Sequence, residues 1–155
     1  MHKVFSIFMC LVLSGCAAGL RVDQLAPIDT SSNEVVILNN TQWNTKMRRA
    51  LSKEGFHVKH FSALKEIELS NNQRKETFNL ADARYGLTLT PGSTVDRCLG
   101  GGAVKFGDFS VEVTDLKTNE MVLVVEQGGW TDFCFPMEGT LFKDLAAAIK
   151  TNWEN

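Results

Sequence analysis

The N-terminus restricts this chain more than any other feature, because the apolar run at 4–13 directly follows a short basic start. A helix needs about 20 apolar residues to cross the hydrocarbon core of a bilayer, so this run is too short for a stable transmembrane helix. A basic start, a short apolar run and the small residues Ser14 and Gly15 are typical of a secretory signal peptide. We therefore expect 1–15 to be cleaved and the rest of the chain to fold outside the cytoplasm.

The sequence Leu13-Ser14-Gly15-Cys16 resembles the lipobox of bacterial lipoproteins. The resemblance implies that Cys16 is alkylated with diacylglycerol and becomes the N-terminal residue, with fatty acyl chains such as palmitate that give stable anchoring. In Gram-negative lipoproteins, Ala17 in place of aspartate implies sorting to the outer membrane. Two alternatives remain: a secretory signal with a coincidental Cys16, and an uncleaved apolar N-terminus.

The charge balance disfavours a nucleic-acid partner. The chain has 16 Lys and Arg against 18 Asp and Glu, a formal net charge of -2, and no clustered basic face of the kind that binds phosphates. Nor is there a basic block that would bind anionic lipid. The lipid on Cys16 must then supply the membrane binding, and no cofactor is expected.

Four cysteines are present, and only two of them remain for the mature domain. Cys10 leaves with the signal peptide and Cys16 carries the lipid, which leaves Cys98 and Cys134. Two thiols in an oxidising compartment tend to form a disulfide. The alternatives are two separately buried thiols, or a redox or metal role, although no C-x-x-C spacing supports the latter.

The first half of the domain predicts a strand, a helix and a second strand. The β-branched run 35–38 predicts a buried strand, 42–54 has apolar residues at helical spacing, and 56–61 alternates loosely as a strand. Thr41 is placed to cap the helix at its start, and Gly55 to form a left-handed cap at its end. This order is typical of a crossover between parallel strands.

The second half predicts mainly antiparallel strands. Alternating residues indicate strands at 85–90 and 109–114, a turn leads into a third at 121–125, and helical spacing at 140–153 indicates a final helix. The polar stretch 65–77 predicts a mobile excursion that holds at most a short strand or helix.

The predicted fold class is therefore α+β. We expect one two-layer domain with a mixed sheet of about four to five strands and two main helices, in the order β-α-β-β-β-β-α. Residues 16–34 show no repeating apolar pattern and predict a flexible tether with an end-to-end distance of roughly 20 to 25 Å. Residues 35–155 form the predicted globular domain.

Three segments resemble small envelope lipoproteins with an α/β domain like the N-terminal domain of TolB or like CsgG: the strand-helix-strand at 35–61, the strand at 83–89 and the hairpin at 110–122. Asn119 stands where the hairpin of that set commonly has glycine, which a left-handed turn position tolerates. The resemblance transfers no catalytic residue. It implies a non-catalytic, protein-binding or assembly role on the periplasmic face of the outer membrane, with another envelope protein as partner.

Motifs for catalysis or metal binding are weak. His57 and His60 have an odd separation on a predicted strand, which puts them on opposite faces, and no cluster completes a metal site. The glycine-rich run 99–107 lacks the Gly-Lys-Ser/Thr ending of a phosphate loop and indicates a flexible connection. We expect no enzyme, and an envelope hydrolase is the weakest alternative.

Two surfaces are candidates for contacts. The apolar residues around Cys134, namely Trp130, Phe133, Phe135 and Met137, form either a partner contact or a cap on the core beneath the last helix. The cationic helix 42–54 faces either an anionic partner or lipid head groups, or it is a solvated face. A second hypothesis is a small-ligand or cell-wall-binding module whose pocket is rimmed by loops 92–108 and 128–137.

Overall fold

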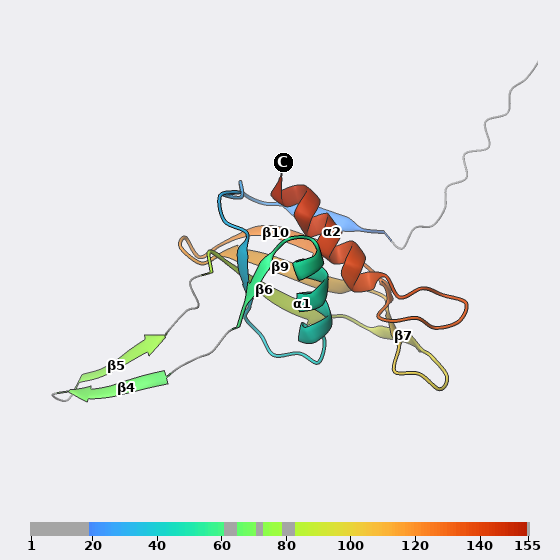
Figure 1. Cartoon of the computed structure of the whole chain (residues 1–155), viewed down its shortest axis with the longest axis horizontal. Coiled ribbons are helices and arrows are strands. Elements are labelled where there is room, and N and C mark those ends of the chain that lie inside the picture. The colour runs from blue at the N-terminus through green and yellow to red at the C-terminus, as the bar shows by residue number, and fades with distance from the viewer. Residues whose placement is uncertain (1–18, 61–64, 71–72, 79–82, 155) are drawn as a thin grey trace, which may run out of the picture.

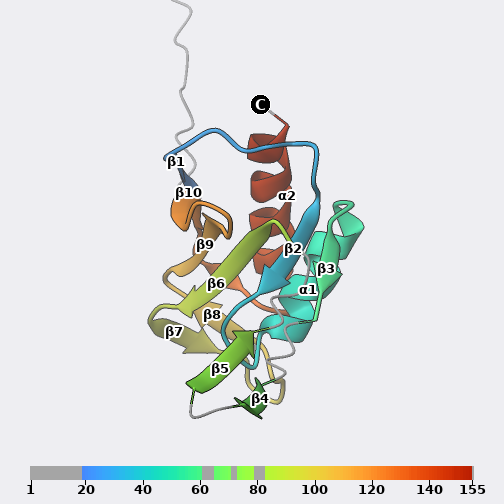
Figure 2. The ribbon, with the colours of Figure 1, turned by 90° about the vertical axis from the view of Figure 1, so that its left-hand side faces the viewer.

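A six-stranded mixed sheet forms the centre of the molecule, and both helices lie on one of its faces (Figures 1 and 2). The computed structural model describes residues 19–60, 65–70, 73–78 and 83–154. The elements are β1 (Arg21–Gln24), β2 (Glu34–Ile37), α1 (Asn44–Lys53), β3 (His57–Lys59), β4 (Lys65–Ser70), β5 (Gln73–Phe78), β6 (Tyr85–Pro91), β7 (Thr94–Arg97), β8 (Val104–Phe106), β9 (Phe109–Asp115), β10 (Glu120–Glu126), β11 (Gly129–Trp130) and α2 (Leu141–Trp153).

The strand order in the main sheet is β1-β10-β9-β6-β2-β3. β2 pairs in parallel with β3 and β6, whereas β6, β9, β10 and β1 pair antiparallel. The architecture is the predicted α+β domain with two helices on a mixed sheet. The main sheet has six strands, which is more than the four to five predicted.

Helix α1 ends as its sequence indicates, but the prediction that Thr41 caps its start is wrong, because the N-cap residue is Trp43 and no side chain caps the helix. The hydroxyl of Thr41 accepts a hydrogen bond of 3.2 Å from the backbone N–H of Trp43, in the turn before the helix. Gly55 has a φ of 88° and the N–H of Phe56 bonds to the carbonyl of Leu51 at 3.1 Å. This is a left-handed helix end of the kind that glycine favours.

The core lies between the sheet and the helices. On β9 the inward residues are buried and the intervening ones more exposed, as the alternation predicted, and β6 follows the same pattern except that Gly86 is buried as well. The last turn of α2 is fixed by Trp153, whose ring centroid lies 4.6 Å from that of Tyr85 and 4.9 Å from that of Phe56. The indole N–H of Trp153 also bonds to the carbonyl of Ser32 at 3.2 Å, which holds the segment before β2 against the core.

Ordered structure begins earlier than predicted. The tether was predicted at 16–34, but β1 (Arg21–Gln24) lies within it and pairs with β10. Most β1 side chains are exposed, so the strand has no apolar alternation that a sequence pattern would reveal. Backbone hydrogen bonds to the edge of the sheet position it, and these do not depend on side-chain type. The predicted signal peptide 1–15 and Cys16 lie outside the described residues.

The predicted loop 92–108 contains two strands, which corrects the flexible connection expected at 99–107. β7 and β8 pair antiparallel, and β11 adds to β8, giving a second, three-stranded sheet. These strands have two to four residues each, too few for a period to emerge from the sequence. The predicted excursion at 65–77 contains β4 and β5, which pair with each other.

Candidate functional site

The predicted disulfide is present and joins two loops at one end of the molecule. Cys98 follows β7 and Cys134 follows β11, and their Cα atoms are 5.7 Å apart. The N–H of Cys98 bonds to the carbonyl of Ala103 at 3.0 Å, and the N–H of Cys134 bonds to that of Met137 at 2.9 Å. Each loop therefore closes on itself, and the disulfide keeps the two loops together.

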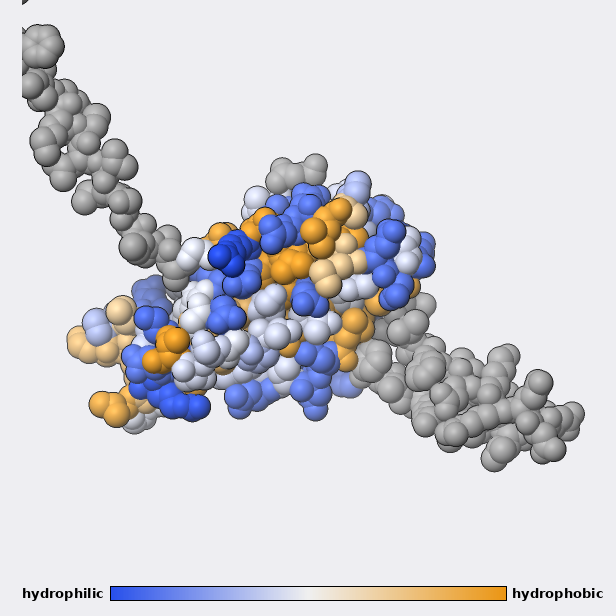
Figure 3. Space-filling model, turned by 180° about the vertical axis from the view of Figure 1, so that it is seen from behind, coloured by the Kyte–Doolittle hydropathy of each residue, from blue (hydrophilic) through white to orange (hydrophobic). Residues whose placement is uncertain are grey.

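Exposed apolar side chains stand on and beside these loops. We call the following five residues the apolar tip: Val95, Leu99, Phe133, Phe135 and Met137. Leu99 is fully exposed, and Phe133 and Phe135 are 67% and 84% exposed. The alternative that this region caps the core beneath α2 is wrong for these side chains, because a cap would be buried. Figure 3 shows apolar residues standing out from this end of the surface.

Trp130 behaves differently from the other three residues predicted to form a partner contact. It is half-buried in β11, and its indole nitrogen is buried without a hydrogen-bond partner in the described part of the chain. A concavity of about 620 Å³ lies between the two loops and is lined by Trp130, by the disulfide and by the apolar tip except Val95. The loops named by the ligand hypothesis therefore do bound a hollow.

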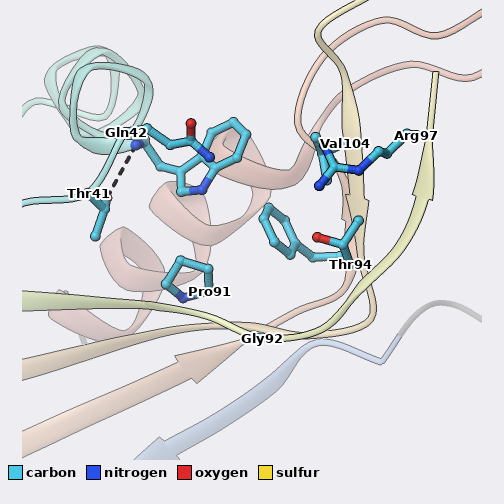
Figure 4. Close-up of a pocket in the computed structure, with 9 residues that line it drawn as sticks. Thr41, Gln42, Pro91, Gly92, Thr94, Arg97 and Val104 are labelled. Atoms are coloured by element: carbon cyan, nitrogen blue, oxygen red, sulfur yellow. Dashed lines mark hydrogen bonds between the residues drawn. The ribbon is translucent and has the colours of Figure 1, made fainter. Parts of the chain in front are cut away.

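A smaller crevice of about 290 Å³ lies between the start of α1 and the strands β6 to β8. Figure 4 shows the guanidinium of Arg97 and the hydroxyl of Thr94 turned into this space, with Gln42 across from them. Neither the crevice nor the concavity is lined by a nucleophile beside a base. Whether the chain is an enzyme stays a prediction.

The outer face of α1 is strongly cationic. Lys46, Arg49 and Lys53 from α1 and Lys143 from α2 line a shallow groove of about 410 Å³, together with Glu54. α1 itself contains no acidic residue. Of these cations, Lys46 alone forms an ion pair in the described residues, with Asp132 on the 131–140 loop. This face therefore offers unneutralised positive charge to an acidic surface.

The opposite end of the sheet is held by an internal polar cluster. Arg84 donates two hydrogen bonds to the buried carboxylate of Asp115, at 2.9 and 2.6 Å, and lies 3.5 Å from Asp29. The hydrogen bonds from Arg84 lower the pKa of Asp115, and those from Ser31 lower the pKa of Asp29. Burial raises the pKa of Tyr85, whose hydroxyl accepts from the N–H of Asp29 at 2.6 Å. Through Asp29, this cluster fixes the segment before β2 to the sheet.

No protein-family model matches this sequence, and neither does any curated protein sequence. Solved structures do match. The PelC dodecamer from Paraburkholderia phytofirmans has a TM-score of 0.52 at 14% identity, over 86% of this chain and 97% of that chain. A single-residue variant of that PelC gives 0.46 over 87% and 95% of the two chains, also at 14% identity. A candidate lipoprotein from Caulobacter crescentus CB15 gives 0.36 at 14% identity, over 80% and 88%.

This chain is similar in fold to PelC. At 14% identity the likeness shows the fold alone. The resemblance to TolB-like and CsgG-like domains stays a prediction.

The predicted site residues have unequal outcomes. Cys98 and Cys134 are brought together, whereas lipidation at Cys16 stays a prediction. His57 and His60 are both exposed, and the described residues contain no group of three or more His, Cys, Asp and Glu placed to bind a metal. No helix in the described part of the chain is long and apolar enough to cross a membrane.

Sequence reasoning missed two members of the apolar tip. Val95 lies in a strand that is too short to show a pattern, and Leu99 is a lone apolar residue between Cys98 and three glycines. The one available signal was the proximity of Leu99 to a predicted disulfide cysteine.

Proposed function

We propose that this chain is a lipoprotein anchored in the outer membrane through acylated Cys16, with its domain on the periplasmic face. It acts without catalysis, as an assembly accessory of the cell envelope that makes contacts through its surface. Another envelope protein, or further copies of the chain itself, is the partner.

The apolar tip is the observation that carries this proposal. Monomeric soluble proteins rarely leave several large apolar side chains exposed next to one another, and such patches mark contact sites. Here four of the five side chains stand on loops that the Cys98–Cys134 disulfide holds together, and Val95 lies in β7 just before Cys98. A contact surface that is ordered before binding loses less conformational entropy when it binds.

Two further observations support an assembly role. The cationic groove on α1 presents Arg49, Lys53 and Lys143 without ion pairs in the described region, which suits an acidic partner surface. The fold is similar to that of PelC, which was solved as a dodecamer. Copies of the same chain are therefore one class of partner to test.

The test begins with the anchor and then measures assembly. Intact-mass analysis of membrane fractions should show a species that starts at Cys16 with added acyl mass, and this species should be absent in Cys16→Ala. Light scattering of the detergent-solubilised lipidated protein, alone and after crosslinking in cells, should show complexes larger than one copy. A lipidated protein that stays monomeric and crosslinks to no envelope protein would contradict the assembly role.

Charge-reversal variants locate the assembly contact. Arg49→Glu with Lys53→Glu should weaken the complexes if α1 faces the partner. Lys117→Glu, which changes an exposed cation in the β9–β10 turn, is the matched control and should leave them intact.

A second candidate function is binding of a small ligand or cell-wall fragment. The concavity of about 620 Å³ between the two disulfide-linked loops favours it. A ligand that binds only the folded state raises its stability, so a panel of cell-wall fragments should raise the melting temperature if this function holds. Loss of that shift in Trp130→Ala would place the ligand in the concavity.

A further inference from the structure

We propose that the apolar tip inserts into the same lipid leaflet that holds the acylated Cys16. The domain is then attached at two points, by its lipid and by its tip, and lies against the membrane instead of floating at the end of a tether. The inference rests on the lipid anchor of the proposed function. It assigns the apolar tip to the membrane, so the protein contact of the proposed function is made by the cationic groove on α1.

The position of β1 brings the anchor close to the domain. β1 begins at Arg21, five residues after Cys16, and five residues span at most about 18 Å even when fully extended. A flexible tether reaching to residue 34 would have allowed much greater separation. Because β1 is part of the sheet, the body of the domain lies near the membrane surface.

The pairing of β1 also decides which end of the domain faces the membrane. Arg21 pairs with Glu126 at the end of β10, and the chain reaches Trp130 of β11 four residues later. The N–H of Phe109 bonds to the carbonyl of Gln127, so the start of β9 lies at this end too. Figure 1 shows the start of β1 and the loops that carry the disulfide at the same, right-hand end of the molecule.

Exposed apolar residues are concentrated at this end. Among the described residues, the large apolar side chains that are exposed are Leu20, Leu25, Val95, Leu99, Met121, Phe133, Phe135 and Met137. Leu20 precedes β1, and the five residues of the apolar tip share its end of the molecule. Leu25 and Met121 lie toward the other end of β10, since the N–H of Leu25 bonds to the carbonyl of Val122. The end next to the anchor is therefore the apolar end.

The chemistry of the apolar tip suits a lipid leaflet. Its side chains project from two loops and from the edge strand β7, where they can enter the boundary between headgroups and acyl chains. Charge near the tip is mixed, because Arg97 stands beside Asp96 and exposed Glu138 follows Met137. Insertion must therefore be driven by apolar burial, and it should respond weakly to salt.

The test measures contact between the apolar tip and acyl chains. The lipidated full protein is reconstituted into phosphatidylethanolamine and phosphatidylglycerol vesicles whose acyl chains carry bromine, which quenches tryptophan fluorescence on contact. Phe135→Trp puts a reporter at an exposed tip position, and Thr118→Trp puts one in the exposed β9–β10 turn at the far end. The wild type supplies the background from Trp43, Trp130 and Trp153.

We expect about a two-fold loss of the added emission in Phe135→Trp and no loss in Thr118→Trp, because insertion reaches only the upper acyl region. The quenching should persist at high salt. Equal quenching of both variants, or no quenching of Phe135→Trp in vesicle-bound protein, would overturn the proposal and assign the apolar tip to a protein partner.

The intact mass of the same samples separates this inference from the proposed anchor. Acylated protein without quenching at Phe135→Trp leaves the anchor standing and removes tip insertion. Protein without acyl mass removes the anchor, and quenching of Phe135→Trp in that sample would still support insertion of the tip.

Discussion

The two ends of the sheet use their side chains in opposite ways. At the β9–β10 turn, Arg84, Asp115, Asp29 and Tyr85 pair with one another, so their polar groups are satisfied inside the domain. At the other end the apolar tip leaves large side chains exposed on loops that a disulfide joins. The first end uses its side chains to stabilise the fold, and the second leaves large apolar side chains exposed that the fold does not bury.

The largest effect should come from removing the disulfide. Cys98→Ser with Cys134→Ser opens a loop with a sequence separation of 36. The chain-entropy model predicts a loss of about 3 to 4 kcal/mol in the free energy of unfolding. Urea denaturation of the variant, beside the wild type with and without reductant, measures it. Equal midpoints for all three samples would show that the loops stay together without the bond.

The next effect should come from the polar cluster. Asp115→Ala leaves the guanidinium of Arg84 without its main partner, while Arg84 is still mostly covered, with 20% of its side chain exposed. Because Arg84 is partly exposed, removing its partner should cost less than breaking a fully buried ion pair. We expect the free energy of unfolding to fall by about 2 to 3 kcal/mol. Glu120→Ala removes an exposed carboxylate at the start of β10, opposite Asp115, and is the matched control. Similar urea midpoints for both variants would contradict a structural role for the cluster.

The same cluster predicts a loss of stability in acid. Arg84 lowers the pKa of Asp115 below its ordinary value of 3.8, so the unfolded chain takes up a proton more readily than the folded one. The stabilisation is complete above that value and is lost as the pH falls through the lower, folded-state pKa of Asp115. Urea midpoints measured from pH 6 down to pH 2 should therefore decline below about pH 4. The decline should be shallower in Asp115→Asn, and an unchanged slope would assign it to other carboxylates.

Helices and strands with a clear repeating pattern of apolar residues could be predicted from the sequence, and strands without such a pattern could not. The helix at 42–54, its glycine end and the strands at 85–90 and 109–114 appear in the structure because an inward-facing side gives each a repeating apolar pattern. β1 is exposed on nearly every residue and is held by backbone hydrogen bonds, so no pattern indicated it. That strand nevertheless begins only five residues after Cys16, the predicted lipidation site.

The candidate site was predicted in part for the same reason. The disulfide followed from counting cysteines after the signal peptide and Cys16 were set aside. The aromatic residues near Cys134 were visible as a cluster in the sequence, but their exposure was not, since the same residues would serve a core equally well. Only the structure places Leu99 beside Phe133 and Phe135, because the disulfide joins segments that are distant in the chain.

The smallest effect on stability should come from the apolar tip itself. Leu99→Ser with Phe135→Ser changes two side chains that are exposed in the folded and unfolded states alike, so the free energy of unfolding should change by less than about 0.5 kcal/mol. Leu123→Ala, at a fully buried position, is the contrasting control and should lose about 2 to 5 kcal/mol.

The contrast between the two ends depends on how little the free energy of unfolding changes in this tip variant. A tip variant that unfolds as easily as the Leu123→Ala control would show that Leu99 and Phe135 pack on the domain, and the tip would then be a structural element like the polar cluster. A tip variant as stable as the wild type, but with altered contact to brominated acyl chains at an added Phe133→Trp reporter on the tip, would separate contact from folding. Such a result would show that the exposed apolar side chains serve contact with the membrane and not folding. In this they would differ from the polar cluster at the other end, whose side chains stabilise the domain itself.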